Sequence, residues 1–242
     1  MPNAITVERI LGAWASLFGC APAELRSAGS LVVPNRAFRA YGDGFLLAYR
    51  QCSLIAVPDE LVPDFRRASA GLPGEAILSV AFLFGVLAGR LDGWYGPAEV
   101  SCLDASDFRP HDTRGARVLD SADAGAYGDL RQAIEADEWT EAGQPELAQA
   151  PLVGCFAGRR LASIAAWQPW GDELADVDVA THPAERRKGY AKAAVSALSR
   201  LGLERGLLMQ YRVREGNLAS AAVGRALGYH ALARQMAFAL RA

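Results

Sequence analysis

The chain has 242 residues, of which 51% are hydrophobic and 21% charged, a composition typical of a globular protein with one large domain or two small ones. Its 25 lysines and arginines stand against 27 aspartates and glutamates, so a formal net charge of −2 supports neither nucleic-acid nor membrane binding. The longest apolar run, 76–89, is shorter than the roughly 20 residues of a membrane-spanning helix and is expected to be buried. The first residues lack the pattern of a secretion signal, which favours a cytoplasmic location.

The cysteines and histidines give no sign of a metal site or of a disulfide framework. No two cysteines form a CxxC pair, as expected for core residues in a reducing compartment, and the histidines are too far apart for a zinc-binding spacing. We therefore expect no metal cofactor. The residues concerned are Cys20, Cys52, Cys102, Cys155, His111, His182 and His230.

The first half of the chain alternates helical and strand patterns. Apolar residues at helical spacing predict a helix over 10–18, and 45–57 predicts a strand. Pro58 followed by Asp59 is typical of a helix start. The polar segment 104–114 contains a proline and is expected to be a connector, so we predict two domains, 1–113 and 114–242.

The second half has a denser pattern. A short strand at 116–119 and a helix face around Tyr127, Leu130 and Ile134 precede a polar loop that holds Trp139. Hairpin and turn signals then predict antiparallel strands at 152–157, 161–167 and 174–181. A helix over 189–206 connects to a strand at 207–213, which predicts a parallel strand pair, and a helix from about 218 and a last strand follow.

The segment 176–195, DVDVATHPAERRKGYAKAAV, carries most of the chemical information. A strand stops at Pro183, a basic triplet occupies 186–188, and Gly189 precedes a helix. Free amide groups at a helix start favour a phosphate, and glycine lets the backbone come close to a ligand. The segment therefore predicts an anion site, although it contains neither a Walker loop nor a dinucleotide-binding fingerprint.

The spacing R-x-x-G-x-A that begins at Arg186 resembles the signature of the GNAT N-acetyltransferase superfamily, whose loop holds the pyrophosphate of acetyl-CoA. The similarity continues through the preceding strand with its T-H-P end, the strand QYRV and a second landmark at 217–229. The resemblance covers about 114–242. It implies an α/β (α+β) fold with a GNAT-like mixed central sheet flanked by helices, preceded by a smaller α/β N-terminal domain that we expect to shape the acceptor site.

This resemblance also implies acetyl-CoA as the cosubstrate. The backbone of 179–181 would pair with the pantetheine arm like an added strand, at a splay between the two central strands. The segment 187–192 would line the pyrophosphate, and Asn217 would contact the cosubstrate near the start of the last helix. The residues expected to bind it are Val179, Ala180, Thr181, Arg186, Arg187, Lys188, Gly189, Tyr190, Ala191, Lys192, Asn217 and Ser220.

The general acid is not evident from the sequence. Many family members carry a tyrosine seven residues after the asparagine as the acid for the leaving thiolate, whereas this chain has Gly224. Ser220, Tyr211, Tyr229 or water could replace it. A thiol of pKa about 8.5 is also a fair leaving group that needs little help.

A general base is needed because an amine of pKa near 10 must lose a proton before it attacks the thioester. The candidates are Glu173, Asp176 and Asp178. In a regular strand the two aspartates share one face and Glu173 lies on the other, so at most one set reaches the cleft. Family members often use a strand carboxylate that acts through water.

Simpler structural roles compete with each of these. The basic triplet could be a solvated turn, Asp176 and Asp178 an exposed strand face, and Asn217 a helix cap. Three tryptophans at strand ends and in the connector could line an acceptor pocket, with core packing the alternative. These are Trp139, Trp167 and Trp170.

Two functions follow from these observations. The first is an N-acetyltransferase that moves an acetyl group from acetyl-CoA to an amine by direct attack, and the second is a non-catalytic acyl-CoA-binding or regulatory module. The expected partner is a small-molecule amine or a protein amine, with no nucleic acid and no membrane. The sequence leaves the acceptor, and the question of a homodimer, open.

Overall fold

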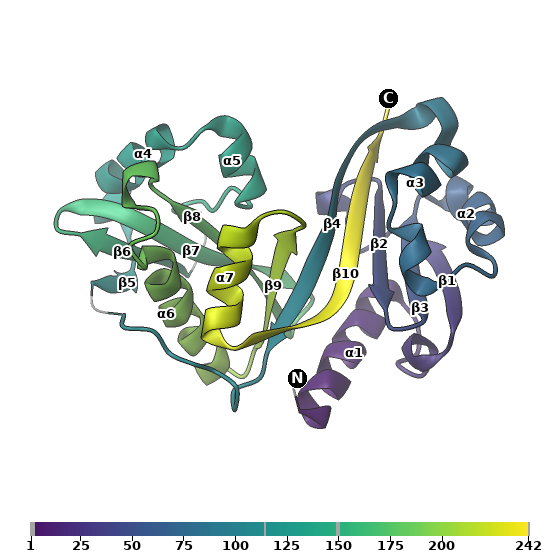
Figure 1. The fold of residues 1–242 in the computed structure, drawn as a ribbon, viewed down its shortest axis with the longest axis horizontal. Coiled ribbons are helices and arrows are strands. Elements are labelled where there is room, and N and C mark those ends of the chain that lie inside the picture. The colour runs from purple at the N-terminus through teal and green to yellow at the C-terminus, as the bar shows by residue number, and fades with distance from the viewer. Residues whose placement is uncertain (1–2, 114, 149–150, 242) are drawn as a thin grey trace.

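The computed structural model describes residues 3–113, 115–148 and 151–241 (Figure 1). In this part of the chain, one mixed sheet of ten strands is flanked by helices, which confirms the predicted α/β class. The strands are β1 (Gly29–Pro34), β2 (Gly44–Tyr49), β3 (Cys52–Val57), β4 (Leu91–Leu103), β5 (Ala116–Val118), β6 (Leu152–Ala157), β7 (Arg160–Trp170), β8 (Leu174–Thr181), β9 (Leu208–Arg214) and β10 (Tyr229–Leu240). The helices are α1 (Ala4–Phe18), α2 (Val62–Ser69), α3 (Val80–Leu87), α4 (Ala124–Ala133), α5 (Ala136–Glu141), α6 (Tyr190–Glu204) and α7 (Leu218–Leu227).

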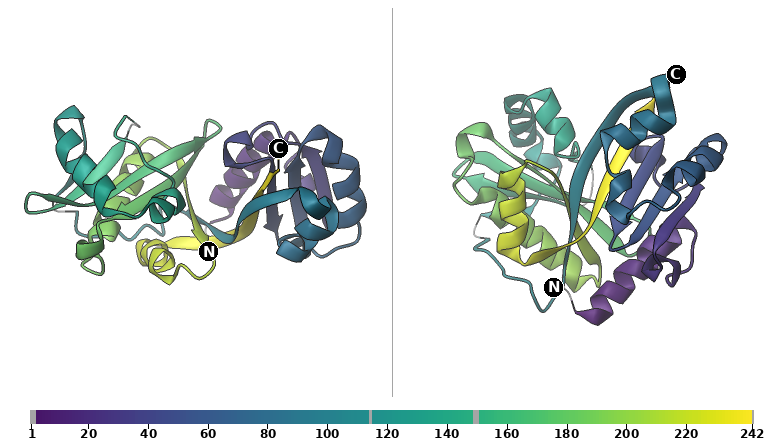
Figure 2. Two further views of the ribbon diagram at one scale, coloured as in Figure 1. Left: turned by 90° about the horizontal axis from the view of Figure 1, so that it is seen from above. Right: turned by 45° about the vertical axis from the view of Figure 1, so that its right-hand side comes forward.

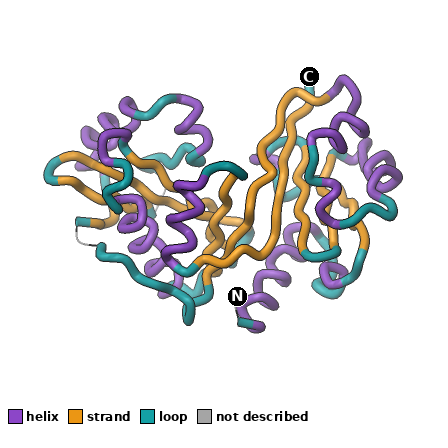
Figure 3. The backbone as a smooth tube through the Cα atoms, in the orientation of Figure 1, coloured by secondary structure: helices purple, strands orange, loops and turns teal. Residues whose placement is uncertain are grey.

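The strand order is β1-β3-β2-β10-β4-β9-β8-β7-β6-β5. The two longest strands, β4 and β10, run antiparallel through the middle and join the two halves of the molecule (Figures 1 and 3). Because β10 pairs with β2 on one side and β4 on the other, the last strand of the chain completes the sheet of the N-terminal half. The division at 113/114 stays a prediction, and the strands on both sides of it form one sheet.

The N-terminal half departs from the sequence prediction in two places. The single strand expected over 45–57 is a hairpin of β2 and β3, which turns at Arg50 with φ 52°. Both strands are fully buried, so no alternation marks the turn. The apolar run 76–89, expected to be buried, contains α3, where Leu83 and Leu87 are buried but Phe84 is 52% exposed.

The sheet is covered by helices on both faces, as the view from above shows (Figure 2). In the N-terminal half, α1 packs over one face of β2, and α2 and α3 pack over the other. In the C-terminal half, α6 and α7 share one core and α4 and α5 another. Alternate residues of a strand supply the two cores, as with Ala165 and Ile164 of β7.

The C-terminal half follows the predicted element order. The β6–β7 hairpin and the antiparallel β7–β8 pair are present, and α6 connects β8 to its parallel neighbour β9. Trp139 is an exception, because the structure places it in α5, only 5% exposed, and not in a polar loop. Its ring packs on Tyr127 and under the guanidinium of Arg131, 4.9 Å from the ring centroid.

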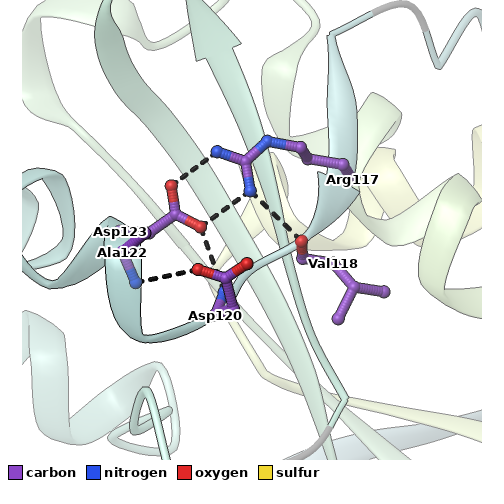
Figure 4. Close-up of polar contacts among 5 residues, drawn as sticks. All are labelled: Arg117, Val118, Asp120, Ala122 and Asp123. Atoms are coloured by element: carbon purple, nitrogen blue, oxygen red, sulfur yellow. Dashed lines mark hydrogen bonds and ion pairs between the residues drawn. The ribbon is translucent and has the colours of Figure 1, made fainter.

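The start of α4 is fixed by a network of carboxylates (Figure 4). Asp123 accepts from both terminal nitrogens of Arg117, at 2.7 and 2.5 Å, and from the backbone N–H of Asp120 at 3.0 Å. The Asp120 side chain accepts in turn from the backbone of Ala122 at 2.8 Å, which completes a capping box. The network ties the 3₁₀ turn at the start of α4, Ser121–Asp123, to Arg117 of β5.

Candidate active site at the splay of β8 and β9

A cavity of about 1200 Å³ opens between β8, the N-termini of α6 and α7, and α5. It exists because β8 and β9 pair only from Leu174–Leu208 to Val177–Tyr211, after which they part. On this side the backbone of residues 178–181 has no strand partner among the described residues, while β7 pairs with their other edge. The splay implied by the family resemblance is therefore present, and an extended ligand could hydrogen-bond to this open edge.

The loop that follows β8 has the geometry of an anion site. Arg187 has φ 64° and Gly189 φ 93°, and such strained backbone outside glycine often marks a functional loop. The first turn of α6 has no side-chain cap and no acidic residue, so its amide groups are open to a ligand. Among the described residues, neither Arg187 nor Lys192 forms an ion pair, and both line the cavity.

The other two basic residues of the loop have partners. Lys188 donates to Glu185 at 2.9 Å, and Arg160 binds the same carboxylate at 3.0 Å, which ties the loop to the β6–β7 hairpin. Lys188 is not among the residues that line the cavity. Arg186 does line it, but its guanidinium forms a two-point ion pair with Glu138 of α5, at 3.2 and 2.7 Å.

Asn217 and Ser220 lie on the opposite wall, at the start of α7. The Asn217 side chain accepts from the backbone N–H of Ser220 at 3.0 Å, so it caps the helix as the simpler interpretation predicts. Its amide also donates to Glu141 of α5 at 3.3 Å. The Ser220 hydroxyl lies 2.8 Å from the hydroxyl of Tyr211 on β9, and both side chains line the cavity.

Asp176 is buried and fully engaged. It is 1% exposed and accepts from Nε and Nη2 of Arg212 at 2.6 and 2.5 Å, and from the Gln210 side chain at 3.1 Å. The rings of Tyr41 and Trp170 lie against the same guanidinium, with centroids 4.7 and 4.9 Å from its central carbon. Because its charge is neutralised and its oxygens are occupied, Asp176 is poorly suited to accept a further proton.

Asp178 lines the same cavity and is also buried, but it lacks the partners that Asp176 has. Among the described residues it forms no ion pair, and its Oδ2 has no hydrogen-bond partner. Burial, and then the negative charge of Asp176, raise the pKa of Asp178 to about 8, although Arg212 and a hydrogen bond from Gln168 lower it. A carboxyl that exchanges its proton near neutral pH and faces a cavity is a candidate acid–base group.

The structure thus brings together most of the predicted site residues and leaves two outside. Glu173 is half exposed, lies in the turn before β8 and pairs with Arg9 of α1 at 3.3 Å. Lys188 belongs to the Glu185 cluster. The predicted site residues that line the cavity are Asp176, Asp178, Val179, Ala180, Thr181, Arg186, Arg187, Gly189, Tyr190, Ala191, Lys192, Asn217 and Ser220.

The space beside Gly224 is occupied by Tyr211. A Cβ at Gly224 would lie 3.1 and 3.4 Å from two carbons of the Tyr211 ring, and 3.7 Å from Cβ of Tyr229. Tyr229 is buried and its hydroxyl bonds Ser199 at 2.7 Å, away from the cavity. The phenol nearest the position of the family's usual tyrosine therefore comes from β9 and not from α7.

Sequence reasoning missed several cavity residues. Tyr41 and Tyr95 come from the N-terminal half, where no motif points to them, and Glu138 and Glu141 come from α5, which the sequence did not predict. Arg212 stands in the recognised strand QYRV, and its charge in a buried strand is the signal that could have singled it out. None of the three tryptophans considered for the acceptor pocket lines the cavity, and each is buried in a core cluster: Trp139, Trp167 and Trp170.

Within the described residues, no group of three or more histidine, cysteine, aspartate or glutamate side chains could hold a metal ion. In the same residues, no helix is long and apolar enough to span a membrane.

Residues 155–237 match the family model described as GNAT acetyltransferase. A search of curated proteins finds no match. Among solved structures, a GCN5-related N-acetyltransferase from Kribbella flavida is 19% identical, with 98% of this chain and 95% of that chain covered and a TM-score of 0.49. A GNAT-family acetyltransferase from Colwellia psychrerythraea is 14% identical, with 67% of this chain and only 62% of that chain covered and a TM-score of 0.49. The protein yncA from Salmonella typhimurium, solved with its cofactor acetyl-CoA, is 19% identical, with 50% and 90% covered and a TM-score of 0.38.

Proposed function

We propose that this chain, whose residues 155–237 match the GNAT acetyltransferase family model, belongs to that superfamily and transfers an acetyl group from acetyl-CoA to an amine by direct attack. In that reaction the amine nitrogen bonds to the acetyl carbonyl carbon and the carbon–sulfur bond breaks. The nitrogen loses one proton and the CoA sulfur gains one. The protein must therefore hold a polyanionic group at one end of the cavity and manage two proton transfers at the other.

The observation that carries this proposal is the distribution of unpaired charge in the cavity. Most charged residues that line it form ion pairs, as Arg186 does with Glu138 and Arg212 with Asp176. Within the part of the chain that the structure describes, the lining residues without an ion-pair partner are two cations at the α6 loop and one acid on β8: Arg187, Lys192 and Asp178. Unpaired cations suit a phosphate group, and an unpaired buried acid suits an amine.

The residues present fit acetyl-CoA. Its pyrophosphate would be held by the free amides of α6 together with Arg187 and Lys192, because these donors surround a loop where Gly189 leaves room. Its pantetheine arm would meet the open backbone edge of 178–181. When bound, it supplies a thioester, whose carbonyl carbon an amine can attack.

The side chains at the splay have separate tasks. Asp178 accepts the proton of the amine, since it lines the cavity, its buried Oδ2 has no hydrogen-bond partner among the described residues, and its pKa of about 8 leaves a useful fraction ionised at neutral pH. On the opposite wall the Ser220 hydroxyl donates a hydrogen bond to the leaving sulfur, which takes its proton from water, because a thiol of pKa about 8.5 is far more acidic than a serine hydroxyl. Tyr211 is a positioning residue there, because its hydroxyl lies 2.8 Å from that of Ser220 and burial raises its pKa, which keeps it protonated.

The test is amine-dependent release of the CoA thiol by the purified protein. Asp178→Asn should lower kcat/KM at pH 7.5 by about 10²–10⁴, the usual contribution of a general base. Its affinity for acetyl-CoA, measured by calorimetry, should be unchanged. Glu173→Gln is the matched control, because Glu173 lies outside the cavity and should leave both quantities unaltered. If acetyl-CoA binds and no amine causes thiol release, the chain is a non-catalytic acyl-CoA-binding module and the proposal is refuted.

A further inference from the structure

The acceptor end of the cavity is built by parts of the chain that lie far apart in the sequence. Asp178 of β8 lies beside Asp176 and Arg212, and the Tyr41 ring lies against that guanidinium. Tyr95 lies on β4, on the far side of β9 from β8. The remaining lining groups of the N-terminal half and β10 are small and apolar, namely Ala40 and Ala237.

The charges at this end leave room for one positive group. Asp178 is a buried acid whose Oδ2 has no partner among the described residues, whereas the other carboxylates that line the cavity on β8 and α5 are ion-paired: Asp176 with Arg212 at 2.5 Å, Glu141 with Arg214 at 2.8 Å and Glu138 with Arg186 at 2.7 Å. An ammonium group at Asp178 would find an unpaired partner. A second ammonium group on the same ligand would have to compete with Arg212 for Asp176 in a desolvated ion pair, or with Arg214 for Glu141 in a more exposed one.

A carboxylate on the acceptor would meet the opposite problem. Arg212 gives two nitrogens to Asp176 and is enclosed by the rings of Tyr41 and Trp170, so its charge is already neutralised. Arg214 is held by Glu141. A carboxylate next to the amine would therefore lose its hydration beside Asp176 and Asp178 without gaining a free cation.

We infer that the acceptor in the reaction proposed above is an apolar primary monoamine with no carboxylate near its nitrogen. Its nitrogen lies at Asp178, and its body lies against the rings of Tyr41 and Tyr95. This excludes free α-amino acids and diamines as good acceptors. The inference rests on the proposed function, and it adds a substrate class to it.

The experiment compares three amines in the thiol-release assay with the full chain. Phenethylamine presents one ammonium on an aromatic body, phenylalanine adds a carboxylate beside the nitrogen, and cadaverine carries a second ammonium. We expect kcat/KM for phenylalanine to be at least 100-fold lower, and for cadaverine at least 10-fold lower, than for phenethylamine. If kcat/KM for phenylalanine or cadaverine equals that for phenethylamine, the inference is overturned, while the proposed acetyltransferase activity is not.

A pair of variants tests the ring contact. Tyr95→Ala should raise KM for phenethylamine about 10-fold with kcat retained, and Tyr95→Phe, which keeps the ring, should not. Methylamine has no hydrocarbon body to place against the ring. The ratio of KM for phenethylamine to KM for methylamine therefore separates loss of this contact from general damage to the fold. If Tyr95→Ala leaves this ratio unchanged, the contact is contradicted. If acetyl-CoA binds but none of the amines causes thiol release, the proposed function itself is refuted.

Discussion

Gly224→Tyr places the family's usual phenol on α7 and tests how this chain uses the space. The hydrogen that Gly224 presents faces the Tyr211 ring, and even a Cβ would lie 3.1 Å from it, closer than ordinary van der Waals contact. A whole tyrosine would have to displace the Tyr211 ring, which is buried and hydrogen-bonded to Ser220 at 2.8 Å. We therefore expect a clash and not a gain of function.

The size of the effect follows from overpacking. Forcing extra atoms into a filled site costs about 1–3 kcal/mol. For a protein of this length each kcal/mol lowers Tm by about 2–4 °C, so Gly224→Tyr should melt about 2–12 °C lower. Turnover should fall as well, because the displaced Tyr211 would no longer hold the Ser220 hydroxyl at the cavity wall.

The assay is a thermal melt with and without acetyl-CoA, run beside thiol release. The control is the double variant Tyr211→Ala/Gly224→Tyr, which removes the ring that blocks the new one. If the two rings compete for one space, the double variant should be more stable than the sum of the single changes by about 1 kcal/mol or more. An unchanged Tm with raised turnover in the single variant would refute the reasoning.

Three further predictions follow from the site. Asp178 has a pKa of about 8 in the folded chain and loses its proton near pH 4 when unfolded, so the free energy of unfolding should fall as pH rises between these values. Over the same range kcat/KM should rise, because the ionised carboxylate is the active base. Thermal melts and pH–rate profiles of Asp178→Asn should show neither trend. Gly189→Glu should weaken acetyl-CoA binding at least 100-fold by calorimetry with far-UV circular dichroism unchanged, since it puts a carboxylate at the anion loop. Glu138→Gln should tighten acetyl-CoA binding about 3–10-fold by freeing Arg186, and an equal gain in Asp137→Asn would contradict this.

The sequence determined those parts of the site in which neighbouring residues act together. The turn after β8, the glycine before α6 and the crossover to β9 are local features, and each depends on a few adjacent residues. The pattern of 176–195 therefore predicted the anion loop and the parallel strand pair. The shared face of Asp176 and Asp178 was also predictable, because residues two apart on a strand point the same way, and both line the cavity.

Only the tertiary structure decided which distant side chains meet at the acceptor end. The last strand, β10, lies between β2 and β4, and this strand order places the N-terminal half, with Tyr41 and Tyr95, beside β9. The contrast between Asp176 and Asp178 also has no local signal, since both are aspartates on one strand face. Arg212, which is 36 residues after Asp176, pairs with Asp176, whereas Oδ2 of Asp178 has no hydrogen-bond partner among the described residues. Burial then sets the pKa of Asp178, because the cost of removing a charge from water depends on everything packed around it.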